Sequence, residues 1–100
     1  MVELGEDVFC DLQQIVRFLS RRNPDAGLQF SRSVRKAFVL LGDHPFIGRP
    51  RPEFDVPGLR SWPVPKFQRH MVFYLEPGEA VRVLRVLNGS RHLTAEHFSS

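Results

Sequence analysis

The feature that most constrains the fold is a pair of helical patterns separated by one short break. Asn23 and Pro24 form that break, since asparagine is a favoured N-cap and proline suits the first position of a helix. On its two sides, apolar residues recur at steps of three or four positions: Val8, Leu12, Ile15 and Leu19 before it, and Ala26, Phe30, Val34, Ala37 and Leu41 after it. Such a short connection predicts an antiparallel helical hairpin. We expect Gly42 to follow the last residue of the second helix, because glycine readily adopts the left-handed conformation found there, and Pro45 to block continuation of the helix.

The second half of the chain carries strand patterns instead of helical ones. The stretch 67–75 ends in a continuous apolar run, and the stretch 80–87 is the strongest strand pattern in the chain, so together they predict a hairpin. The stretch 59–64 predicts an irregular or bulged strand, because one proline lies within it and another follows it. Residues 2–4 predict a further, very short strand.

The order of these elements, β-α-α-β-β-β, predicts one α+β domain over residues 1–100. Its two layers are a helical hairpin and a small antiparallel sheet on which the hairpin packs. The stretch 43–58 is rich in proline but too apolar for a disordered linker. We expect it to be an ordered loop that Phe46, Ile47 and Phe54 pin to the core.

Composition and charge exclude several classes of protein. No apolar run approaches the roughly 20 residues that a membrane-spanning helix needs, and the acidic start MVELGEDVF does not have the layout of a signal peptide. We therefore expect a cytoplasmic protein without membrane contact. The single cysteine, Cys10, excludes an internal disulfide, and the cysteine and histidine spacing matches no zinc site, so we expect neither metal nor cofactor. The net charge of +3 arises from residues 44–100 and is too small to indicate nucleic-acid binding by itself.

Five stretches carry a family resemblance over nearly the whole chain. They are DLQQIVRFL, NPDAGLQF, LLGDHPFIGRPRPEF, VPGLRSWPV and HMVFYLEPGEAVRVLRVLNGSRHL. In this order and spacing they resemble toxins of the RelE/ParE superfamily, and more closely its ParE branch. Asn88 departs from the family pattern, which often has histidine there, and His92 stands where aspartate is common.

This resemblance implies the toxin half of a type II toxin–antitoxin pair with the RelE/ParE-like fold. The implied partner is an acidic antitoxin that folds as it binds and forms a hetero-oligomer with the toxin. A ParE-like toxin inhibits DNA gyrase, has no catalytic reaction of its own and binds no nucleic acid sequence-specifically. Two alternatives stay open: a RelE-like, ribosome-dependent endonuclease that cuts messenger RNA, and an inactive relative that serves only in the antitoxin complex.

The candidate contacts to the target or the antitoxin lie in the second half of the chain: Arg60, Arg85, Arg91, His92 and Phe98. Arg85 interrupts an apolar strand, and a buried arginine must be paired. It either pairs with a carboxylate at the edge of the core or projects into a groove toward a partner. Simple alternation places Arg85 on one strand face with Val81 and Val83, and places Val86 on the other face.

The endonuclease alternative needs a base, an acid and cations around a phosphate. Its candidate catalytic residues are Arg91, His97, Arg60 and Lys66.

Four phenylalanines in the helices exceed what one core stripe needs: Phe9, Phe18, Phe30 and Phe38. They either fill the core or line a groove that the antitoxin covers. His70 lies within a strand pattern, and we expect it to be a partly buried structural residue.

Overall fold

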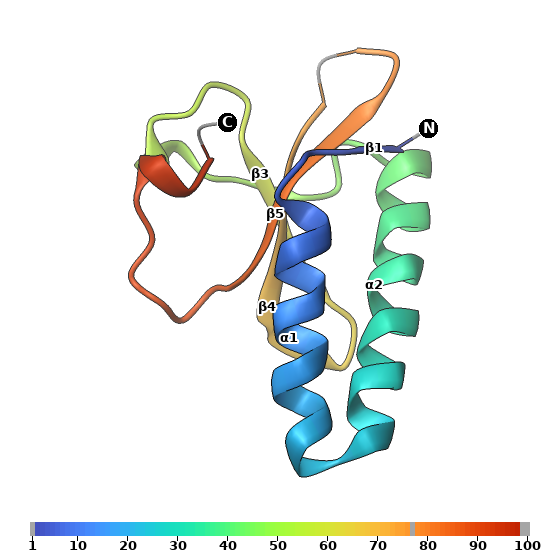
Figure 1. Cartoon of the computed structure of the whole chain (residues 1–100). Coiled ribbons are helices and arrows are strands. Elements are labelled where there is room, and N and C mark those ends of the chain that lie inside the picture. Colours follow the sequence, from blue (N-terminus) through green and yellow to red (C-terminus); the bar gives the residue numbers. More distant parts are fainter. Residues whose placement is uncertain (1, 77, 99–100) are drawn as a thin grey trace.

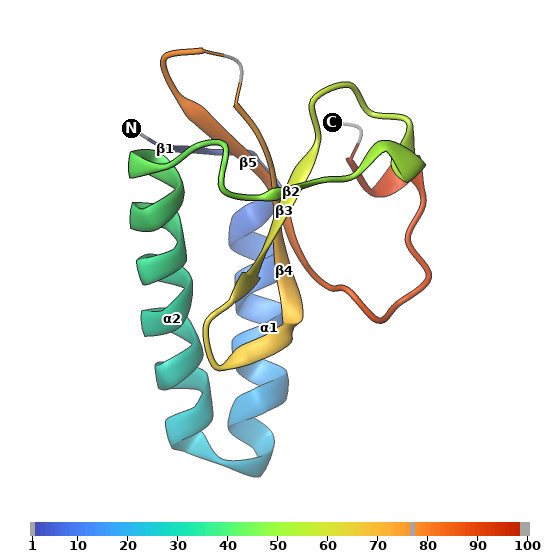
Figure 2. The same cartoon turned by 180° about the vertical axis from the view of Figure 1, so that it is seen from behind.

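The computed structural model describes residues 2–76 and 78–98, and in it two helices cover one face of a five-stranded sheet (Figure 1). The elements are β1 (Val2–Leu4), α1 (Val8–Arg22), α2 (Pro24–Asp43), β2 (Arg49–Pro50), η1 (Pro52–Phe54), β3 (Arg60–Val64), β4 (Phe67–Leu75), β5 (Val81–Asn88) and η2 (Ala95–Phe98). Figure 2 shows that the irregular segments containing η1 and η2 lie on the other side of the sheet from the helices. The predicted α+β class and element order are confirmed, with β2 and η1 added inside the expected loop.

The sheet is mixed, which corrects the expectation of a purely antiparallel one. The strand order is β1-β5-β4-β3-β2, and β1 runs parallel to β5 while the other pairs are antiparallel. A three-residue strand carries no signal for the direction of its partner, which here is the last strand of the chain. The predicted irregularity of β3 is confirmed as a shift of register between Pro63 and Val64.

The helical hairpin forms as predicted, with one correction at its end. The side chain of Asn23 caps α2 by accepting a hydrogen bond of 3.0 Å from the backbone N–H of Asp25. Gly42 does not end α2, because the helix continues to Asp43 and His44 is the capping residue. His44 precedes Pro45, and the residue before a proline is disfavoured in helical conformation, so the proline determines the end of the helix.

The sheet has a buried cluster on each face. The first lies against the helices and includes Phe30, Val34, Leu41, Val64, Val72, Tyr74, Val81, Val83 and Val86. The second lies under the irregular segments and comprises Leu59, Phe73, Leu87 and Phe98, with Phe54 packed against it. The sheet is therefore covered on both faces, and the C-terminal tail belongs to the second cluster.

A β-bulge in β5 explains why simple alternation misplaced one residue. Tyr74 pairs with Val83 and Phe73 pairs with Arg85, so Leu84 is the extra residue. The alternation shifts by one position at the bulge. Val86 consequently packs in the first cluster with Val83, and the prediction that placed it on the opposite face is wrong.

Of the three apolar anchors expected in the loop after α2, Phe54 packs against the second cluster, and hydrogen bonds hold the part of the loop nearer the helix. Phe46 is 66% exposed and Ile47 is also exposed, so neither pins the loop. The Tyr74 hydroxyl instead accepts a hydrogen bond of 2.8 Å from the Gly48 N–H and donates one of 2.8 Å to the Pro45 carbonyl. Burial raises the pKa of Tyr74, and a Cβ at Gly48 would overlap the tyrosine hydroxyl.

Asp11 joins α1 to β5 through a buried carboxylate that is only 5% exposed. Its two oxygens accept hydrogen bonds from Arg85, of 2.8 Å from Nε and 2.7 Å from Nη2, and one of 3.1 Å from the Val86 N–H. Nη1 of Arg85 also donates a hydrogen bond of 2.9 Å to the carbonyl of His97, in η2. Of the two alternatives for Arg85, the structure shows the carboxylate pair.

His70 packs its ring against the core from the rim of β4. The ring lies 5.2 Å from that of Phe30 in an edge-to-face arrangement, and burial lowers the pKa of His70 below its ordinary value. The uncharged form is therefore the one that the folded chain favours at neutral pH.

Replacing Asp11 with alanine should lower the free energy of unfolding by about 2–4 kcal/mol, because the half-buried guanidinium of Arg85 and the buried Val86 N–H lose their acceptor. Urea denaturation monitored by circular dichroism measures the change. Asp43→Asn, at an exposed position at the end of α2, is the control and should change stability by less than about 0.5 kcal/mol. Equal stability of Asp11→Ala and the unmodified chain would contradict the assigned role.

The lowered pKa of His70 should make stability depend on pH. The unfolded chain binds the proton first, near a pH of about 6.5, so stability is fully present above that value. It falls as the pH drops toward the lower folded-state pKa, and then levels off. Urea midpoints measured across this range should decrease less for His70→Gln than for the unmodified chain, and Gln68→Ala should follow the unmodified chain. An NMR titration of the His70 ring at or above its ordinary pKa would contradict this assignment.

Candidate functional site

The strongest candidate site is a concave surface of about 670 Å³ between α1 and the ends of β4 and β5, called here the basic groove. Three cations from separate segments line it: Lys66, Arg69 and Arg91. Its apolar lining comes mainly from α1 and consists of Ile15, Phe18, Leu19 and Phe67. The groove also contains Gln14, Gln68, His70 and Asn88.

Local backbone geometry brings the cations of the basic groove together. Lys66 occupies the turn between β3 and β4, where it has a φ of 69°. At the end of β5, the Asn88 side chain accepts a hydrogen bond of 2.9 Å from the Ser90 N–H, and the Asn88 carbonyl accepts one of 3.2 Å from the Arg91 N–H. The N–H of Gly89 donates a hydrogen bond of 2.6 Å to the carbonyl of Arg69, which connects this turn to β4. Asn88, which departs from the family pattern, thus shapes the turn that leads to Arg91.

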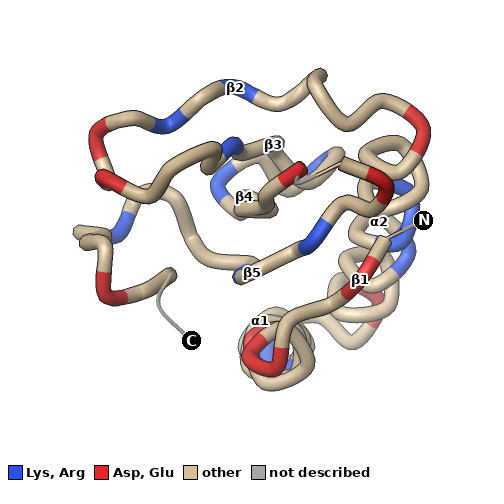
Figure 3. Tube along the Cα trace, turned by 90° about the horizontal axis from the view of Figure 1, so that it is seen from above, with Lys and Arg blue, Asp and Glu red and all other residues tan. Residues whose placement is uncertain are grey.

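The basic groove carries positive charge without compensation. Within residues 2–76 and 78–98, Lys66, Arg69 and Arg91 form no ion pair and no side-chain hydrogen bond, and no acidic residue lines the groove. The acid on the same face of α1, Asp11, is buried in its pair with Arg85. Figure 3 shows acidic positions near basic ones over much of the trace and a further group of basic positions along α2.

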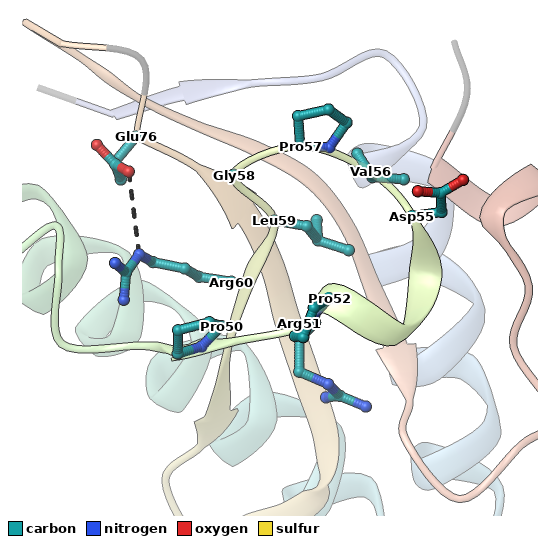
Figure 4. Close-up of a pocket in the computed structure, with 10 residues that line it drawn as sticks. All are labelled: Pro50, Arg51, Pro52, Asp55, Val56, Pro57, Gly58, Leu59, Arg60 and Glu76. Atoms are coloured by element: carbon teal, nitrogen blue, oxygen red, sulfur yellow. Dashed lines mark ion pairs between the residues drawn. The ribbon is translucent and has the colours of Figure 1, made fainter.

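A second cleft, of about 310 Å³, surrounds Arg60 beside the segment from Pro50 to Leu59 (Figure 4). Its arginines are committed to contacts within the chain. Arg60 donates to the carbonyls of Phe46 and Gly48, at 3.3 and 2.8 Å, and lies 3.9 Å from the carboxylate of Glu76. Arg60 therefore organises the loop between α2 and β3.

Arg51 holds the same cleft together from its other side. It donates a hydrogen bond of 2.8 Å to Glu53, which lowers the pKa of that carboxyl group, and one of 2.9 Å to Ser61. Its guanidinium also lies over the rings of Phe54 and Phe73. The cleft thus has cations in its walls, but each of them already makes contacts within the chain.

A third surface is an apolar groove of about 440 Å³ between α1 and α2, called here the helical groove. Phe9 and Phe38 line it, and Phe9 is 69% exposed. Of the four phenylalanines in question, Phe30 is buried in the core and Phe18 belongs to the basic groove. The surplus of phenylalanine therefore divides between one core residue and two surface grooves.

The structure places the predicted contact residues in different environments. Arg91 lines the basic groove, and His92 is exposed just after it. Arg60 lies in the second cleft, and Arg85 in the ion pair with Asp11, which raises the pKa of the arginine. Phe98 is only 6% exposed and its ring lies 4.8 Å from that of Phe73. Phe98 thus packs in the second cluster, and its contact with a partner stays a prediction.

The candidate catalytic residues do not form one constellation. Arg91 and Lys66 share the basic groove, while Arg60 lies in the other cleft. His97 is engaged within the tail, where Nδ1 accepts a hydrogen bond of 3.1 Å from the Thr94 N–H. Arg69, which sequence reasoning considered but did not select, also lines the groove, because the fold brings β4 beside the tail.

Two further observations bear on the class of site. Among residues 2–76 and 78–98, no three histidine, cysteine or acidic residues gather as metal ligands would. Over the same part of the chain, no helix has the length and apolar character needed to cross a membrane.

Comparisons with known proteins agree with this fold. The family model described as "ParE toxin of type II toxin-antitoxin system, parDE" matches residues 2–93. A solved structure described as "Chromosomal ParDE TA system from P. aeruginosa" is similar, with a TM-score of 0.73 and 18% sequence identity over 87% of this chain and 92% of that one. At this identity the likeness shows the fold alone. No curated protein matches the chain significantly.

Proposed function

Because this chain belongs to the ParE toxin family of type II toxin–antitoxin systems, we propose that it inhibits DNA gyrase and that a cognate antitoxin neutralises it. In this proposal the chain acts by binding and has no catalytic reaction of its own. It would act in the cytoplasm, where gyrase and its DNA are found.

The observation that carries this proposal is the separation of the candidate catalytic residues. Cutting RNA through its 2′-hydroxyl requires a base, an acid and phosphate-binding cations within hydrogen-bond reach of one nucleotide. Here Arg60 is bound to loop carbonyls and Glu76 in one cleft, and His97 is bound within the tail. Only Lys66 and Arg91 share a surface. This arrangement favours a binding protein over an endonuclease.

An antitoxin partner is supported by family membership and by the exposed surfaces of the chain. The similar solved structure is described as a ParDE system. We propose an acidic antitoxin that folds as it binds and forms a hetero-oligomer with this chain. Arg91 and His92, which are exposed, remain the proposed contacts to antitoxin or target. Arg60, Arg85 and Phe98 would act indirectly, by holding the loop and the tail in place.

Purified chain should inhibit DNA supercoiling by purified gyrase and should raise the amount of cleaved DNA trapped on the enzyme. Agarose-gel assays with relaxed and supercoiled plasmid measure both effects. The control is the same chain mixed beforehand with the protein encoded beside it, which should restore supercoiling.

No effect on gyrase at high molar excess would overturn the gyrase assignment. Messenger-RNA cleavage in a translating ribosome assay would then favour the RelE-like alternative. Absence of both effects, together with a stable antitoxin complex, would identify an inactive relative.

A further inference from the structure

We propose that the basic groove is the docking site for an acidic, amphipathic segment of the antitoxin. This inference rests on the proposed function, because the antitoxin is part of it. It adds the surface that the antitoxin occupies and the chemistry of the segment that binds there.

The floor of the groove is suited to apolar side chains of a protein. Ile15 and Leu19 are aliphatic, and Phe18 is a large apolar side chain that remains 55% exposed. Residues three and four positions apart lie on one face of a helix, so Ile15, Phe18 and Leu19 form a continuous apolar strip along α1. Covering this strip would remove apolar surface from water, which is the main driving force of association.

The rim of the groove is suited to carboxylates. Lys66, Arg69 and Arg91 are exposed at its edge and, within the described ranges 2–76 and 78–98, have no acidic partner. By contrast, Arg85 is engaged with Asp11 and Arg60 with Glu76. Opposite charges across an interface fix the orientation of a partner and accelerate its association.

A protein segment fits this groove better than a nucleic acid does. A strand of nucleic acid needs cations that follow its phosphates and aromatic faces on which its bases stack. Here the lining beside the exposed cations comes largely from one apolar strip of α1, in which the aromatic Phe18 lies between the aliphatic Ile15 and Leu19. An amphipathic segment would place its apolar side chains on this floor and its carboxylates on the rim, as helices bound in grooves do.

The chain offers a matched set of charges for the test. The variant Lys66→Glu/Arg69→Glu/Arg91→Glu reverses the groove, and the control Lys36→Glu/Arg32→Glu/Arg35→Glu reverses one lysine and two arginines on the exposed side of α2. Both variants therefore change the net charge equally. The probe is the antitoxin encoded beside the gene for this chain, and isothermal titration calorimetry measures its dissociation constant.

The groove variant should bind the antitoxin roughly 30-fold more weakly or worse, because carboxylates would then face like charges. The control should stay within about threefold, as expected of exposed charges outside an interface. Binding by the unmodified chain should weaken between roughly 50 and 300 mM salt, and the groove variant should lose most of that dependence. If charge reversal prevents folding, Lys66→Gln/Arg69→Gln/Arg91→Gln should still weaken binding about fivefold.

Three outcomes would overturn the proposal. In the first, a folded groove variant binds the antitoxin as tightly as the unmodified chain. In the second, the α2 control or Phe9→Ser, in the helical groove, weakens binding as much as the groove variant does. In the third, the unmodified chain binds a short fluorescein-labelled single-stranded oligonucleotide through the three groove cations more tightly than it binds the antitoxin.

The gyrase assay keeps this proposal separate from the proposed function. If antitoxin binding depends on the groove cations but the chain has no effect on gyrase, the docking site is supported and the gyrase assignment is rejected. If the chain inhibits gyrase but the groove variant binds the antitoxin as tightly as the unmodified chain, only the docking site is rejected. An unmodified chain that binds no antitoxin overturns both.

Discussion

The carboxylate of Asp11 is the contact on which the arrangement of this molecule depends. Among the described residues, strand β1 pairs with β5 from Val81 to Val83, and no strand of this part of the chain lies along the edge of β5 beyond that point. Asp11 replaces that strand by accepting the N–H of Val86, and it neutralises Arg85 at the same time. The third guanidinium nitrogen of Arg85, Nη1, donates a hydrogen bond to the carbonyl of His97. One buried side chain thus fixes α1, β5 and the C-terminal tail relative to one another. Burying charges costs free energy, so a pair of this kind fixes the relative positions of these elements as much as it stabilises the fold.

That fixed position also determines the character of the candidate surface. The residues of the groove floor follow Asp11 along the same face of α1, one and two turns further on, at Ile15 and Phe18. Because Asp11 is already bound to Arg85, it does not offset the cations of the rim, which belong to the β3–β4 turn, β4 and the tail. The tail is held in turn by Phe98 in the second cluster and by the carbonyl of His97. Contacts in the interior of the protein therefore determine where the residues of the groove lie.

Local rules predict the elements of this fold well and their long-range partners poorly. The Asn23 cap and the bounds of β4 follow from neighbouring residues, and both are found as predicted. Gly42 does not end α2, whereas Pro45, which is two residues beyond the helix and was expected to block it, does. The parallel pairing of β1 and the bulge at Leu84 depend on partners far along the chain. Periodicity carries no information about such partners.

The candidate site depends even more on long-range partners, because they determine which cations make no ion pair within the chain. In the sequence, Arg60, Arg85 and Arg91 are all candidate contacts, since each is an arginine in or beside a strand pattern. Their difference arises from partners 12 to 74 positions away, such as Gly48 for Arg60 and Asp11 for Arg85. Only Arg91 keeps its charge available, because the Asn88 turn carries it past the end of the sheet. An arginine already satisfied inside the fold has little to gain from a partner, since binding would have to replace hydrogen bonds that it already makes. The cations that recognise a partner are thus those that the fold leaves unsatisfied, and they are identified only after every internal pair has been assigned.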